Sequence, residues 1–152
     1  MIVGVLGGTF ENIHVGHIKL LMTAFLLSDK VIIGVTSDDM ATKMRRRRVK
    51  NFEKRVKELK NIIESISNSK EYVITKIDDP YGPADKLDEI NLIVVSTETF
   101  SMARKINRSR IKKGMRPLLI VVIELIETDS GYKVSSSLIH HKKVDEWGRQ
   151  AT

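Results

Sequence analysis

Short apolar runs and amphipathic stretches alternate along the whole chain. Most of the runs are continuously apolar, which is typical of parallel strands covered on both faces. The expected strands are 2–6, 31–36, 72–77, 92–95 and 118–126, and the expected helices are 14–27, 52–66, 99–113 and 136–147. This alternation predicts an α/β fold, a Rossmann-like doubly wound sheet of about five mainly parallel strands with helices on both faces. Such folds bind ligands at the carboxyl ends of the strands.

Length and composition narrow the class of protein. A chain of 152 residues without a repeat or linker is expected to form one domain, residues 1–152. No apolar run reaches the length of a transmembrane helix, and the first residues lack the basic region of a signal peptide. The absence of cysteine excludes disulfides and cysteine–zinc sites. A cytoplasmic location without a membrane partner is therefore expected.

A formal net charge of +7 favours an anionic partner, either nucleic acid or a small phosphorylated ligand. Aromatic residues make up 5% of the chain, and few of them interleave with basic residues. Stacking on single-stranded nucleic acid is thereby disfavoured, and no nucleic-acid partner is expected.

The strongest candidate for chemistry lies at the amino end. The first expected strand runs into Gly7, Gly8, Thr9 and Phe10, and the first expected helix opens with His14, Gly16 and His17. Glycines after a strand let a phosphate approach the backbone, and histidines three residues apart share one helix face beside free N–H groups. A tight turn with surface histidines is the plain alternative. Metal ligation is disfavoured because no third ligand follows at a familiar spacing, and neither a P-loop nor a dinucleotide fingerprint is present.

Two further segments carry phosphate-binding residue types. Ser135, Ser136 and Ser137 begin the last expected helix, where they either cap it or hold a phosphate. The segment from Thr36 to Arg55 contains Lys43, Arg45–Arg48 and Lys50. It is either a solvated basic face or a mobile cationic loop that closes over a polyphosphate, with Arg55 as another candidate contact.

Two polar segments follow later strands. Asp79 and Tyr81 lie in a proline-restricted turn, which alone is more typical of structure than of function. Residues Ser96, Thr97, Glu98 and Thr99 lead into a helix that carries Asn107 and Arg110. They are either a capped helix start with a polar face or polar groups at the active edge of the sheet.

These motifs resemble a known superfamily. Gly7-Gly8-Thr9-Phe10 followed by His14-x-Gly16-His17 resembles the signature of the HxGH nucleotidyltransferases. Segments 79–83, 95–99 and 106–110 are similar to the archaeal phosphopantetheine adenylyltransferases and to the matching domain of eukaryotic coenzyme A synthase. The family's C-terminal signature usually ends in a basic arginine or lysine, and His140 stands there in this chain.

The resemblance implies transfer of AMP from ATP to 4′-phosphopantetheine, with Mg²⁺ held mainly by the ATP phosphates and no metal site on the protein. It implies roles for three catalytic residues: Thr9 positions the attacking phosphate, His17 contacts the α-phosphate and Lys43 bridges the two. It implies that ATP is bound by Gly7, Gly8, Thr9, Phe10, His14, Gly16, His17, Ser96, Thr97, Glu98, Thr99, Arg110, Ser135, Ser136 and Ser137, and the acceptor by Thr9, Lys43, Asp79 and Tyr81.

Two alternatives stay open. One is a sibling transferase whose acceptor is nicotinamide mononucleotide, glycerol phosphate or phosphocholine. The other is a non-enzymatic nucleic-acid binder that uses Arg45–Arg48, for which steep salt dependence would be diagnostic.

Overall fold

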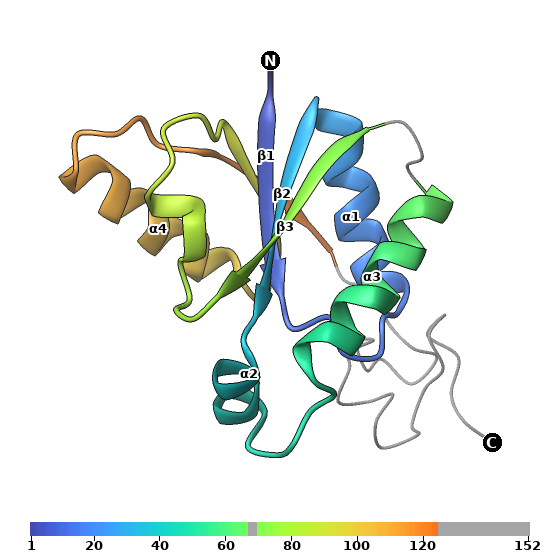
Figure 1. Cartoon of the computed structure of the whole chain (residues 1–152). Helices are drawn as coiled ribbons and strands as arrows, with labels where there is room; N and C mark the ends of the chain where they lie inside the picture. The colour runs from blue at the N-terminus through green and yellow to red at the C-terminus, as the bar shows by residue number, and fades with distance from the viewer. Residues whose placement is uncertain (67–69, 125–152) are drawn as a thin grey trace.

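A parallel sheet with helices on both faces forms the described part of the chain, residues 1–66 and 70–124 of a computed structural model (Figure 1). The strands are β1 (Val3–Gly8), β2 (Lys30–Thr36), β3 (Glu71–Ile77), β4 (Leu92–Ser96) and β5 (Leu119–Ile123). The helices are α1 (Val15–Leu27), α2 (Asp38–Arg45), α3 (Phe52–Ile66) and α4 (Phe100–Lys112), with a 3₁₀ turn η1 (Gly82–Asp85). The predicted α/β class is confirmed.

The strand order is β3-β2-β1-β4-β5, and every pairing is parallel. The chain builds outward from β1 through β2 to β3, then crosses to the other side of β1 for β4 and β5. The order therefore reverses between β1 and β4, and in doubly wound sheets ligands bind at the carboxyl ends of such a pair.

The core has two layers because side chains alternate along each strand. Leu6 of β1 packs with α1 and α3 on one face of the sheet, whereas Val3 and Val5 pack with α4 and η1 on the other. Figure 1 shows α1 and α3 on one side of the strands and α4 on the other. Burial on both faces explains why the strands are continuously apolar in the sequence.

The expected helices and strands agree with those observed within a few residues at each end. The helix expected at 136–147 and the end of the last expected strand lie outside the described residues. None of the helices in residues 1–66 and 70–124 has both the length and the hydropathy needed to cross a membrane.

Candidate active site

A strained loop joins β1 to α1 at the carboxyl edge of the sheet. Residues 7–14, called here the glycine loop, contain two non-glycine residues in the left-handed region, Phe10 at φ 54° and Asn12 at φ 52°. The Phe10 ring is 1% exposed and packs in the core, which holds this conformation in place. A Cβ at position 8 would lie 3.2 Å from that ring, a tight contact that favours glycine there. Strained loops held by good packing are concentrated at functional sites.

The two histidines cap α1 together. His14 is the N-cap residue, and its Nδ1 accepts a hydrogen bond from the Gly16 N–H at 3.1 Å. The Nδ1 of His17 accepts from the His14 N–H at 3.3 Å. The two rings stack with centroids 3.8 Å apart. Because both Nδ1 atoms are acceptors, each neutral ring carries its proton on Nε2 and has that N–H left to donate.

Burial keeps both rings neutral. Burial, together with the smaller effect of the positive charge of Arg45, lowers the pKa of His14 to about 4. Burial also lowers the pKa of His17 well below its ordinary value, followed by the charges of His14 and Arg45. A pair of neutral N–H donors can hydrogen-bond phosphate oxygens in the ground state and in a five-coordinate transition state.

Thr9 is a buried residue of the glycine loop. Its side chain is buried, and its hydroxyl accepts a hydrogen bond from the Thr36 hydroxyl at 3.2 Å. The Thr9 carbonyl accepts from Arg55 Nη1 at 2.9 Å. The end of β1 is therefore tied to the end of β2 and to α3 at the point where the histidines begin.

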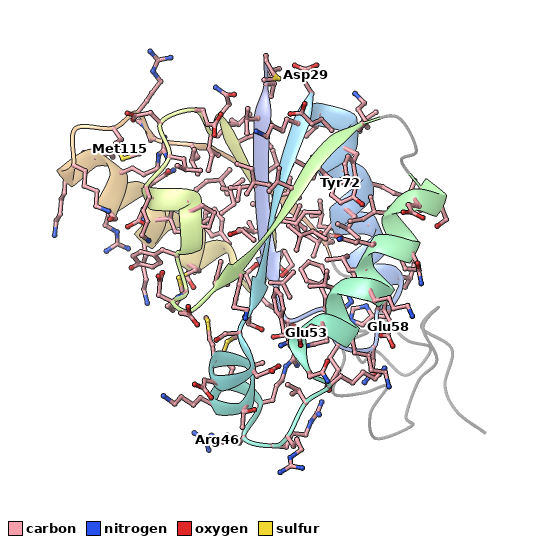
Figure 2. The ribbon with its side chains drawn as sticks, in the orientation of Figure 1. Asp29, Arg46, Glu53, Glu58, Tyr72 and Met115 are labelled. Atoms are coloured by element: carbon pink, nitrogen blue, oxygen red, sulfur yellow. The ribbon has the colours of Figure 1, made fainter. Side chains whose placement is uncertain are left out.

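The segment from Thr36 to Arg55, for which a solvated basic helix face and a mobile cationic loop were the alternatives, contains the helix α2. Ser37 caps α2 by accepting from the Met40 N–H at 3.3 Å, and Arg46, at φ 55°, ends it. Asp38 and Asp39 lie in its first turn and Lys43 and Arg45 in its last, which matches the helix dipole. Arg46 lies at the outer end of the molecule beyond α2 (Figure 2).

A cavity of about 650 Å³ opens beside the glycine loop. Its wall combines the ends of the central strands with side chains of α2, α4 and the turn before η1. Predicted site residues in this wall are Gly7, Gly8, Lys43, Tyr81 and Thr99, and the apolar ones include Met40, Met44, Pro80, Met102 and Ile106. The cavity thus joins a phosphate-type loop, one cation and a long apolar surface, an arrangement that suits a phosphate attached to an elongated, largely neutral chain.

Two predicted binding residues have structural roles. Arg110, expected at ATP, is fully buried and donates to the carbonyls of Arg116, Ala84, Leu87 and Ile90. It holds the turn around η1 against α4 and does not line the cavity, and its expected contact with ATP stays a prediction.

Asp79, expected at the acceptor, accepts from the N–H groups of Tyr81 and Gly82, each at 2.9 Å, and pairs with Lys86. It shapes the turn whose residue Tyr81 reaches the cavity, and it does not line the cavity itself. The side chain of Asn107 likewise bonds the backbone of Leu118 at both ends.

Of the four predicted site residues 96–99 after β4, only Thr99 lines the cavity. Ser96 is buried, and Thr99 Oγ1 accepts from its N–H at 3.1 Å. Thr99 lines the cavity, whereas Thr97 and Glu98 are exposed nearby along the chain. Residues 135–137, expected at the triphosphate, lie outside the described residues, so their convergence with His17 stays a prediction.

Sequence reasoning missed the buried carboxylate of Glu11. This residue of the glycine loop is 3% exposed, with Oε1 at 2.6 Å from Arg47 Nη2 and Oε2 accepting from the Lys50 N–H at 2.8 Å. The signal available in the sequence was a charged residue, Glu11, between Phe10 and the His14-x-Gly16-His17 motif. Glu11 fastens the cationic segment, defined here as residues 43–50, to the glycine loop.

No group of three or more histidine or acidic side chains in residues 1–66 and 70–124 could hold a metal ion.

Comparison with known proteins identifies the class and then the family. The family model described as cytidylyltransferase-like matches residues 5–142, a class consistent with this fold and glycine loop. The phosphopantetheine adenylyltransferase of Pyrobaculum aerophilum is 40% identical over 135 residues, 89% of this chain and 87% of that protein. The one of Thermococcus kodakarensis is 42% identical over 146 residues, 95% and 88% of the two chains. The chain belongs to the phosphopantetheine adenylyltransferase family of these nucleotidyltransferases.

A solved structure supports the fold. The crystal structure of a protein of unknown function from Archaeoglobus fulgidus has a TM-score of 0.72 and 40% sequence identity, and the match covers 81% of this chain and 89% of that one. The architecture described above is thus shared by a relative whose structure was determined experimentally.

Proposed function

We propose that this protein transfers the adenylyl group of ATP to 4′-phosphopantetheine, forming dephospho-coenzyme A and pyrophosphate. The observation that carries the proposal is the similarity, 40% across 89% of the chain, to archaeal proteins that bear the name of this activity. The apolar cavity beside the glycine loop supports the acceptor, because a pantetheine arm is long and uncharged whereas nicotinamide mononucleotide and glycerol phosphate are compact and polar.

The reaction needs alignment and charge stabilisation rather than a strong base. An oxygen of the acceptor phosphate attacks the α-phosphorus of ATP, the new P–O bond forms, and the bond to the β-phosphate breaks as pyrophosphate leaves with the electron pair. The nucleophile is already anionic, so no proton has to be removed first.

One group of residues binds the phosphates of ATP and another positions the acceptor. His17 and His14 donate Nε2–H bonds to the α-phosphate and to the β/γ side, respectively. Lys43, at the mouth of the cavity, bridges the acceptor phosphate and the α-phosphate, and Thr9 orients the acceptor. The γ-phosphate meets Ser135–Ser137, and the adenosine lies near Ser96–Thr99. When bound with ATP, Mg²⁺ supplies positive charge to the triphosphate.

A pyrophosphate-release assay on the purified protein tests the proposal. ATP and CTP are each paired with 4′-phosphopantetheine, nicotinamide mononucleotide, glycerol phosphate and phosphocholine. Release with ATP and 4′-phosphopantetheine, at least about tenfold faster than with any other pair, is expected for a site that uses the whole acceptor for alignment. Faster release with another acceptor would assign the sibling activity. Salt-dependent binding of DNA or RNA without any release would favour the nucleic-acid binder.

A further inference from the structure

Arg55 lies in the first turns of α3, and its side chain is 0% exposed. In the sequence, Arg55 is a candidate contact of the ligand. A ligand in solution has no access to a fully buried guanidinium. A buried cation is costly unless hydrogen bonds and charge satisfy it. Its partners therefore show why this position is charged.

The guanidinium of Arg55 binds four separate segments. Nη1 donates to the Thr9 carbonyl at 2.9 Å and to the Thr36 hydroxyl at 3.3 Å. Nε donates to the Lys50 carbonyl at 2.7 Å, and Nη2 donates to Asp38 Oδ1 at 3.1 Å. The acceptors belong to the glycine loop, the carboxyl end of β2, the connection before α3 and the first residue of α2.

One rigid group therefore sets the separation of the two parts that hold the acceptor phosphate. Thr9 is fixed through its own carbonyl and through Thr36, which also bonds its hydroxyl. The helix that carries Lys43 is fixed at its start through Asp38, and the connection after it through Lys50. Among the residues of α2 itself, Ala41 is the one that is buried.

We propose that Arg55 is a positioning residue for adenylyl transfer. Its guanidinium holds the glycine loop and α2 at the spacing that aligns the acceptor phosphate with the α-phosphorus. The inference rests on the proposed function for its chemistry. Its physical basis is that in-line attack is sensitive to displacement, about a hundredfold in rate for about 1 Å. Lysine cannot replace this group, because a single ammonium cannot span acceptors arranged around a planar fork.

The chain offers a matched control in Arg110. Both arginines are fully buried, and both donate from Nε and both terminal nitrogens. Arg110, however, binds backbone carbonyls around η1 and the end of α4, and none of its partners lies in the glycine loop or α2. Arg110→Lys therefore reports the loss of a buried fork that lies outside the glycine loop and α2 and borders the cavity only through Ala84.

The experiment compares Arg55→Lys and Arg110→Lys in melting temperature, kcat and KM. Both substitutions are expected to lower the melting temperature. Arg55→Lys is expected to lower kcat about thirtyfold or more while the KM for ATP changes less than about threefold, because alignment rather than ATP binding is lost. Arg110→Lys is expected to lower kcat per folded molecule by a clearly smaller factor than Arg55→Lys does, because none of its partners lies in the glycine loop or α2. Equal losses of kcat in the two variants, or a folded Arg55→Lys enzyme with native kcat, would overturn the inference.

A second measurement needs no substrate. Lys43 and Arg45–Arg48 are trypsin sites in the cationic segment, and mass spectrometry resolves cleavage at each. Cleavage there is expected to rise about tenfold in Arg55→Lys and to stay unchanged in Arg110→Lys, because local opening governs the rate. If Arg55→Lys does not fold, Asp38→Ala breaks the α2 bond alone and is expected to raise the same cleavage. If the wild type lacks the proposed activity, unchanged cleavage would still refute the anchoring, whereas raised cleavage would uphold it.

Discussion

In each of the two histidines, one ring nitrogen caps α1 and the other is left to donate a hydrogen bond. Nδ1 of each accepts a backbone N–H at the start of α1, which stabilises the helix end and fixes the ring. That bond leaves the proton on Nε2, the nitrogen available to a ligand. The HxGH spacing thus serves helix capping as well as the proposed catalysis, since the N-cap and the third helical residue form a reciprocal pair.

His17→Ala tests the catalytic half of this arrangement. The substitution removes one donor to the transferring phosphate, and such a donor is worth about a hundredfold in kcat. Steady-state kinetics with saturating ATP should show that loss. Thr23→Ala is the control on the same helix, because its hydroxyl only bonds the Lys19 carbonyl. Full turnover by a His17→Ala protein with a native circular-dichroism spectrum would remove His17 from the mechanism.

At the scale of elements, the connection between α2 and α3 is held by Glu11 of the glycine loop and by Arg55 of α3. The N–H of Lys50 bonds the carboxylate of Glu11, and its carbonyl bonds Arg55. The backbone of Lys50 in the cationic segment is therefore anchored twice, by Glu11 and by Arg55. Arg45 lies close enough to the histidines to lower the pKa of both rings, whereas Lys43, Arg46 and Arg48 are exposed.

Glu11→Gln tests the anchor from the loop side. The substitution keeps the shape but replaces one acceptor by a donor, which faces the donors of Arg47 or Lys50. A loss of about 1–3 kcal/mol in the free energy of unfolding is expected, measured by urea denaturation. Glu58→Gln is the control, since Glu58 on the surface of α3 pairs with Lys50 at 3.4 Å and should matter by about 0.5 kcal/mol or less (Figure 2). Equal effects in the two variants would contradict the anchor.

The sequence predicted the elements that are set by local pattern and missed those set by tertiary contacts. The strands and long helices were predictable because both faces of β1 and β2 and one face of α3 are apolar. For α2 a solvated basic helix face and a mobile loop both stayed open, because Ala41 alone is buried in it and its apolar pattern is weak. The structural role of Arg110 was missed, because polarity on a helix facing the active edge does not reveal four backbone carbonyls behind it.

At the scale of the molecule, the site follows from strand order. Gly7 and Gly8, where β1 ends, line the cavity together with the end of β4 and residues of η1 and α4. The other end of the glycine loop leads to His14 and His17 at the start of α1. The loop therefore connects the cavity to the histidines, so that two substrates can meet at one strand end, which is what a transfer between them requires.

Stability of the whole molecule should fall as the pH is lowered, and the sign follows from three groups. The folded pKa of His14, about 4, lies below its ordinary 6.5, and that of His17 is lowered too. Burial alone raises the pKa of Asp85, but hydrogen bonds from Ser109, Lys113 and Lys86 outweigh it and bring it to about 2, below 3.8. Each group binds protons more readily when unfolded, so protonation favours unfolding. Their contributions are complete at neutral pH, the histidine part being lost between 6.5 and about 4 and the Asp85 part between 3.8 and about 2.

The measurement is the melting temperature of the wild type and of His14→Asn near neutral pH and near pH 5. Asparagine is a good N-cap, so the variant keeps α1 capped while it loses the titrating ring. The wild type should lose more stability than the variant on acidification, and general charge repulsion cancels in that comparison. Titration by nuclear magnetic resonance should place the midpoint of His14 near 4. A midpoint near 6.5 with parallel melting curves would mean that His14 is not a buried, neutral donor. The capping geometry would then no longer account for how the ring is presented to phosphate.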